Sequence, residues 1–156
     1  MKLLSTSASN TKIAKTQKKE QIQTRVASLS LYPDHITCAG SKAAKCMEAC
    51  LKSAGMGVFS NVKAGRKAKT DWFHADQDAF LAQLCKELYN FDMLCKRSGS
   101  IGQVRLNTIS DIAWEKLGVP QLFPDLNFYD YSKRVERIGN TPTNYKLMFS
   151  YSGAPT

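Results

Sequence analysis

Val104–Ile112 reads Val-Arg-Leu-Asn-Thr-Ile-Ser-Asp-Ile, and Leu126–Lys133 reads Leu-Asn-Phe-Tyr-Asp-Tyr-Ser-Lys. Each run looks like a β-strand and ends in polar side chains that are able to do chemistry. The spacer between the runs is long enough for a short helix. Strands joined in this way lie parallel in α/β proteins, which place functional groups at the carboxyl ends of neighbouring strands. The two runs therefore predict a parallel pair with a polar site at its carboxyl end.

Further strands and helices are expected on both sides of this pair. Strands are predicted over 25–32 and 145–151, and helices over 42–54, 63–69 and 76–97. The helix over 76–97 is the clearest, because its apolar residues recur at three- and four-residue steps. This order favours an α/β fold, a small and mainly parallel sheet with helical crossovers. Four strands cannot close an eight-stranded barrel, so the sheet is open or part of a barrel.

The length and composition predict one globular domain with a basic extension. The chain has 156 residues, of which 43% are hydrophobic and 22% are charged. We expect a mobile basic arm over 1–24 and a single α/β domain over 25–156. No apolar run reaches the roughly 20 residues of a membrane span, and the polar residues after Leu4 do not fit a signal peptide. A cytoplasmic protein without a disulfide framework is therefore expected.

The positive charge is concentrated in the first half of the chain. Residues 1–69 hold 13 Lys/Arg against 3 Asp/Glu, whereas residues 70–156 hold 9 against 10, and the net charge is +9. Such an asymmetry favours a polyanionic partner, with nucleic acid the commonest, or a nucleotide. The alternative is a solvated face that only aids solubility. The candidate phosphate contacts are Lys12, Lys15, Lys18, Lys63, Arg66, Lys67, Lys69 and Arg105.

Polar residues at the predicted strand ends form the candidate catalytic site. They comprise two carboxylates, an amide, a hydroxyl and an ammonium group, contributed by Asn107, Ser110, Asp111, Asp130 and Lys133. Such a group can bind a metal, a sugar or a base edge, or transfer a proton. In the structural alternative, Asp111 caps the next helix, Asp130 pairs with Lys133 or Arg134, and Asn107 satisfies buried backbone groups.

Cysteine and aromatic residues provide two further candidate sites. Cys38, Cys46 and Cys50, with His35 as a fourth ligand, could hold zinc, or the thiolates could hold an iron–sulfur cluster. Packing on an alanine-rich helix is the alternative for these cysteines. Aromatic residues beside basic ones, Trp72 to His74 after Lys69 and Tyr129 and Tyr131 before Lys133, could stack on bases or could be core residues.

Several motifs resemble those of a family carried by bacteriophages and plasmids. They are Arg105-Leu106-Asn107-x-x-Ser110-Asp111-Ile112-x-Trp114-Glu115, Phe128-Tyr129-Asp130-Tyr131-Ser132-Lys133, Asn144-Tyr145 with Phe149-Ser150, and Cys46-x3-Cys50-Leu51-x-x-Ala54-Gly55. The likeness covers roughly residues 12–152. It implies the product of a mobile element in a bacterial host cell, and no activity comes with it.

The sequence leaves three functions open. The first is a phage or plasmid accessory protein that binds nucleic acid or nucleotides through a basic surface and a polar site at the strand ends. The second is an enzyme that modifies a base or nucleotide with zinc or an iron–sulfur cluster. The third is a binding module that inhibits a host protein.

Overall fold

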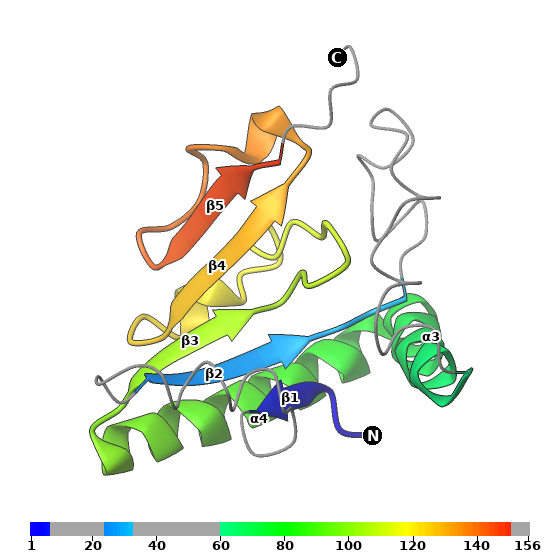
Figure 1. Cartoon of the computed structure of the whole chain (residues 1–156), viewed down its shortest axis with the longest axis horizontal. Helices are drawn as coiled ribbons and strands as arrows, with labels where there is room; N and C mark the ends of the chain where they lie inside the picture. The colour runs from blue at the N-terminus through cyan, green and yellow to red at the C-terminus, as the bar shows by residue number, and fades with distance from the viewer. Residues whose placement is uncertain (7–23, 33–59, 151–156) are drawn as a thin grey trace.

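The computed structural model describes residues 1–6, 24–32 and 60–150, which form a mixed α/β fold (Figure 1). Its strands are β1 (Leu4–Thr6), β2 (Thr24–Leu29), β3 (Ile101–Arg105), β4 (Asn127–Ser132) and β5 (Tyr145–Phe149). They form one open sheet in the order β1-β2-β3-β4-β5. The pairs from β2 to β5 are parallel, and β1 runs antiparallel to β2. The predicted α/β fold with a mainly parallel sheet is therefore confirmed.

The long helix α4 (Gln77–Ser98) forms where the apolar periodicity predicts it. Asp76 caps its first turn by accepting a hydrogen bond from Ala79 N at 3.1 Å. Gly99 ends it with a positive φ of 67°, a conformation that glycine adopts without a steric cost. The buried residues at three- and four-residue steps are Phe80, Leu84, Leu88, Phe91 and Cys95. This stripe packs on the sheet, where Gly102 of β3 leaves room for Phe91 and Cys95.

A second helix, α3 (Ser60–Ala75), contains the predicted basic helical segment 63–69. It is held to the end of β2, because Tyr32 N donates to Arg66 O at 3.3 Å and to Thr70 Oγ1 at 2.8 Å. The ring of Phe73 packs edge-on against Phe80 of α4, with ring centroids 5.3 Å apart. Neither helix, nor any other helix among the described residues, is long and apolar enough to cross a membrane.

All described connections between the parallel strands lie on the α4 side of the sheet. The strand order advances by one neighbour at each step, and right-handed crossovers then stay on one face. Side-chain contacts place the β3–β4 connection on the α4 side. Leu126 lies beside Gly102, next to Phe91 and Cys95 of α4, and Trp114 packs against Phe73 with ring centroids 5.9 Å apart. Among the strands in residues 1–6, 24–32 and 60–150 the order never reverses, so these strands form no switch point of the kind at which open α/β sheets usually bind ligands.

The first residues differ from the predicted mobile arm. Leu3 and Leu4 are buried, and β1 pairs with β2 through Leu4 opposite Leu29. The carboxylate of Glu87 on α4 accepts hydrogen bonds from Leu3 N at 2.9 Å and from Leu4 N at 3.0 Å. The prediction of a mobile arm is therefore wrong for residues 1–6, because burial of two leucines outweighs the polar residues that follow. Residues 7–23 lie outside the described ranges.

The strand predicted over 104–112 is also shorter than expected. β3 ends at Arg105, and the chain then turns away from the sheet. Beyond β3, the side chain of Asn107 pairs with the backbone of Ile112 in place of a neighbouring strand. Ile112 N donates to Asn107 Oδ1 at 3.0 Å, and Asn107 Nδ2 donates to Ile112 O at 2.8 Å. Asparagine competes in this way with sheet pairing, so the strand stops before it.

Candidate functional site

Arg137 lies at the centre of the polar cluster beyond the ends of β3, β4 and β5. It belongs to the short 3-10 helix η4 (Val135–Arg137) and is 1% exposed. Its Nε and Nη2 each donate to a carboxylate oxygen of Glu115 at 2.9 Å, and its Nη1 donates to Asp111 Oδ1. Burial lowers the pKa of Arg137, but Glu115, Tyr145 and Asp111 outweigh burial and raise it. The guanidinium is therefore a buried cation between two carboxylates.

Asp130 lies where β3 and β4 separate and is 1% exposed. Its Oδ1 accepts from Asn107 N at 2.9 Å, and its Oδ2 accepts from the Tyr145 hydroxyl at 2.8 Å. Arg137 Nη2 donates to the same hydroxyl at 3.2 Å, so Asp111 and Asp130 lie in one network. Burial raises the pKa of Asp130 from 3.8 to about 7, against the lowering effect of its hydrogen bonds to Tyr145 and Asn107.

Ser110 and Asn107 anchor the loop that leads from β3 into this network. Asn107 is 2% exposed, and its Oδ1 accepts from Ser110 Oγ at 2.8 Å and from Trp114 Nε1 at 3.0 Å. The side-chain amide of Asn107 therefore satisfies buried backbone and side-chain groups, which is the structural role predicted from the sequence as the alternative to catalysis. Asp111, by contrast, caps no helix: it binds Arg137 and also accepts from Ser132 Oγ at 2.8 Å.

Lys133 lies at the edge of the network. Its backbone N donates to Asp111 Oδ2 at 3.1 Å, and its Nζ donates to Ser150 Oγ at 3.2 Å beyond the end of β5. It does not pair with Asp130, and Arg134 pairs instead with Glu136 at 2.9 Å. The five predicted residues therefore meet at the strand ends, but their polar atoms contact one another. The contacts cross-link the ends of three strands, and a catalytic role for these residues stays a prediction.

The sheet face opposite α4 has a different chemical character. The strand register turns one set of alternate residues toward it, namely Ser5, Thr24, Val26, Ser28, Ile101, Gln103, Arg105, Asn127, Tyr129, Tyr131, Lys146 and Met148. Neither Asp nor Glu occurs among these described residues, whereas Arg105 and Lys146 are cationic. Figure 1 shows how β3, β4 and β5 present this face.

The exposed large apolar and aromatic side chains of this face are Ile101 on β3, Tyr131 on β4 and Met148 on β5. Tyr131 is 47% exposed and Met148, opposite it on β5, is 38% exposed. The guanidinium carbon of Arg105 lies over the Tyr131 ring, 5.3 Å from its centroid. Arg105 Nε is also 3.8 Å from Asp130 Oδ1, too far for a hydrogen bond. This sheet face with its central pair, Arg105 and Tyr131, is called the open face below.

The basic residues of α3 contribute unequally to the surface. Lys67 is exposed, whereas Lys63, Arg66 and Lys69 are partly buried. Lys69 Nζ donates to Leu3 O at 3.2 Å, and burial lowers the pKa of Lys69. Of the predicted phosphate contacts in the described part of the chain, Arg105 lies on the open face and Lys67 is exposed on α3.

Other predicted residues fall outside the described ranges. These are the arm residues Lys12, Lys15 and Lys18 and the proposed metal ligands Cys38, Cys46, Cys50 and His35. Within residues 1–6, 24–32 and 60–150, no group of three His, Cys, Asp or Glu side chains could hold a metal ion. Cys85 and Cys95 are free thiols at the core, and burial raises the pKa of both.

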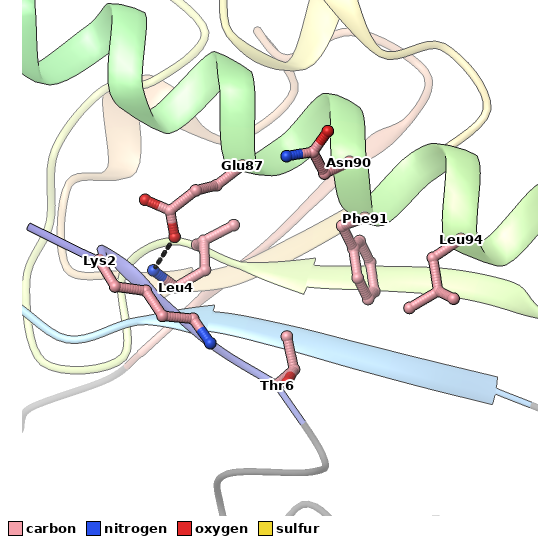
Figure 2. A pocket seen from close by; sticks show the side chains of 7 residues that line it. All are labelled: Lys2, Leu4, Thr6, Glu87, Asn90, Phe91 and Leu94. Atoms are coloured by element: carbon pink, nitrogen blue, oxygen red, sulfur yellow. Dashed lines mark hydrogen bonds between the residues drawn. The ribbon is translucent and has the colours of Figure 1, made fainter.

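A pocket of about 230 Å³ lies between β1 and α4 (Figure 2). Leu4, Phe91 and Leu94 form most of its wall, with Asn90 at its side. Figure 2 shows the Glu87 carboxylate directed to the backbone of β1, where it accepts from Leu4 N. Glu87, the one carboxylate among the described residues that line this pocket, is thus already bound by the backbone of β1.

Sequence reasoning missed three residues of the strand-end network. Arg137 donates to Asp111, and Tyr145 donates to Asp130 and accepts from Arg137, which links the two aspartates. Ser132 donates to Asp111. A buried arginine has no local signature, because its partners lie 22 and 26 positions away in the chain. The burial of Tyr145 was foreseeable in part, since it begins a predicted strand, but its pairing with Phe128 is visible only in the structure.

Comparison with known proteins identifies the family. A family model, Gene product 88, matches residues 2–156. The chain belongs to the Gene product 88 family. The predicted resemblance to a phage-borne family is confirmed at this level, although the match does not test the individual motifs. No curated protein and no solved structure shows a significant match.

Proposed function

We propose that this Gene product 88 protein binds nucleic acid through the open face of its sheet. The observation that carries the proposal is the composition of that face, which combines cations, aromatics and amides and has no carboxylate among the described residues that alternate onto it. A polyanion gains attraction to Arg105 and Lys146 there, and no carboxylate side chain alternates onto the described part of that face. As a member of a phage-type family, the protein would meet its ligand in the cytoplasm of a bacterial host.

The side chains of the open face also fit the chemistry of nucleotides. Lys146 on β5 lies opposite Tyr129 on β4, so an ammonium group and an aromatic ring are neighbours. Gln103 and Asn127 are register partners on β3 and β4, and their amides can donate to and accept from base edges. Phosphate contacts supply affinity, whereas base contacts supply specificity. Lys67 on α3 extends the positive surface beyond the end of β2.

The hydrogen-bonded network around Arg137 lies at the strand ends and positions residues of the open face. Asp130 contributes to both, because its carboxylate lies 3.8 Å from Arg105 and accepts a hydrogen bond from Tyr145. It holds β3, β4 and β5 in register at the end where Arg105 and Tyr131 lie. In this proposal the predicted strand-end residues position the binding face, and the polar site that they form is not itself the main contact.

Salt-dependent binding tests the proposal. Fluorescence anisotropy with the full chain and labelled oligonucleotides should show an affinity that falls linearly with salt on a log–log scale, by about one power per phosphate contact. Lys146→Gln removes an exposed cation from the open face and should lower that slope by about one. Lys86→Gln, on the outer side of α4, is the matched control and should leave the slope unchanged. Undetectable or salt-independent binding would refute the proposal, as would equal effects of the two variants.

A further inference from the structure

We infer that the open face binds single-stranded nucleic acid, with Tyr131 as a stacking site for an unpaired base. This inference rests on the proposed function and specifies its ligand class. Tyr131 is nearly half exposed near the end of β4, beyond the point where β3 and β4 separate, and its neighbour on β5, Met148, is exposed as well. An aromatic ring held open to solvent on a rigid strand is suited to contact with a flat ligand.

Arg105 holds the Tyr131 ring in place. Its guanidinium carbon lies over the ring, 5.3 Å from the ring centroid, and Tyr131 as a whole stays 47% exposed. Arg105 is itself restrained, since it is 28% exposed and its Nε lies 3.8 Å from the buried carboxylate of Asp130. A base that stacks on Tyr131 therefore meets a ring whose orientation is already set, and less entropy is lost on binding.

The positions of the cations fit the backbone of the same strand of nucleic acid. Lys146 faces the same side as Tyr131 and lies opposite Tyr129, two residues earlier on β4. Two residues along a strand span about 6.6 Å, and adjacent strands lie about 4.8 Å apart. A nucleotide with its base on Tyr131 can thus place a neighbouring phosphate near Lys146.

Duplexes cannot use this arrangement. In a duplex the bases are stacked on one another, and the flat surface of a sheet cannot reach between them. A single strand can turn its bases onto the sheet, where every base offers a π-face to Tyr131. The geometry therefore favours single strands of DNA or RNA and does not depend strongly on sequence.

The test measures anisotropy of the full chain with four labelled probes of equal length. The probes are single-stranded DNA, single-stranded RNA, duplex DNA, and a single strand with abasic sites and the same number of phosphates. Tyr131→Ala should weaken binding to the normal single strands by roughly 5- to 150-fold, the range for loss of one stacked base. It should leave the duplex and abasic affinities unchanged, and Tyr131→Trp should retain single-strand binding.

Tyr89→Ala is the matched control, because Tyr89 is 58% exposed and lies on α4, away from the open face. The inference fails if Tyr131→Ala behaves as Tyr89→Ala does, or if the wild-type protein binds duplex as tightly as single strands. In that case salt-dependent binding to any probe would still sustain the proposed function. If no probe shows salt-dependent binding, both proposals fall. Comparison of the DNA and RNA probes shows which single strand is bound.

Discussion

Replacing Arg137 with methionine should destabilise the protein more than any surface substitution. Methionine keeps an unbranched apolar side chain in place of the aliphatic part of arginine but removes every hydrogen-bond donor of the guanidinium. Glu115 then loses two donors at 2.9 Å, and Asp111 loses its ion pair, while both carboxylates stay largely buried, with side-chain exposures of 6% and 10%. Breaking a buried ion pair by removal of one partner costs about 3–5 kcal/mol.

We expect about 4 kcal/mol for Arg137→Met, which is a large share of the 5–15 kcal/mol that keeps a typical domain folded. With an m-value of about 2 kcal/mol per molar urea, the unfolding midpoint should fall by about 2 M. The assay is urea unfolding followed by tryptophan fluorescence, because Trp114 is fully buried beside the network. Arg137→Lys should recover less than half of the loss, since a lysine cannot contact both oxygens of Glu115 in a fork.

The matched control is Arg134→Met. Arg134 also pairs with a glutamate at 2.9 Å, but its partner Glu136 is 61% exposed, so the loss should stay below about 1 kcal/mol. A double-mutant cycle with Glu115→Gln should give a coupling free energy of about 1–3 kcal/mol. Equal losses for Arg137→Met and Arg134→Met would refute the view that the buried network holds the strand ends together.

Four further substitutions probe other parts of the fold. The pKa of Asp130 is raised from 3.8 to about 7 in the folded protein, so the protonated Asp130 stabilises the fold. This contribution to the free energy of unfolding is complete below about pH 4 and is lost as the pH rises through 7. The total fall is about 4 kcal/mol. Urea titrations at pH 5 and pH 8 should show about 3 kcal/mol of this fall, because part of it has already occurred between about pH 4 and pH 5. Asp130→Asn should lack the fall, and identical pH profiles would contradict this. Gly102→Ala would place a methyl group 2.5 Å from Leu126 Cδ2 and 3.0 Å from Cys95 Sγ, which should cost about 1–3 kcal/mol in thermal unfolding. Gly65→Ala in α3 has open space around it and should stabilise by up to about 1 kcal/mol, so a loss at both glycines would argue against the packing explanation. Asn107→Ala leaves Trp114 Nε1 and Ile112 N without their acceptor and should cost at least about 2 kcal/mol, whereas unchanged urea unfolding would show that other groups replace the amide.

Much of the architecture follows from local patterns. The stripe from Phe80 to Cys95 and the caps at Asp76 and Gly99 specify α4, because they act within the helix itself. The parallel order of β2 to β5 follows from the crossovers between them, and it brings the polar strand ends together as predicted. Pairing of β1 with β2 was missed because three residues carry too little periodicity to be read as a strand.

The contacts of the strand-end network could be predicted only in part from local sequence patterns. Asn107 and Ser110 contact residues a few positions away, and an asparagine in a strand-like run was a local sign that pairing ends there. Arg137 binds Glu115 and Asp111 from more than 20 positions away. Nothing in its own segment separates it from Arg134, which is three residues earlier and pairs with an exposed glutamate.

The chain by itself determined which residues alternate along each strand, because the two-residue period of a strand is set by covalent geometry. Asp130 and Tyr131 therefore had to point in opposite directions. Only the tertiary structure decided which direction is covered, because α4 and the described crossovers all pack on the side that Asp130 faces. That choice buries Asp130 beside Tyr145 and Arg137, and it leaves Tyr131 on the open face under Arg105.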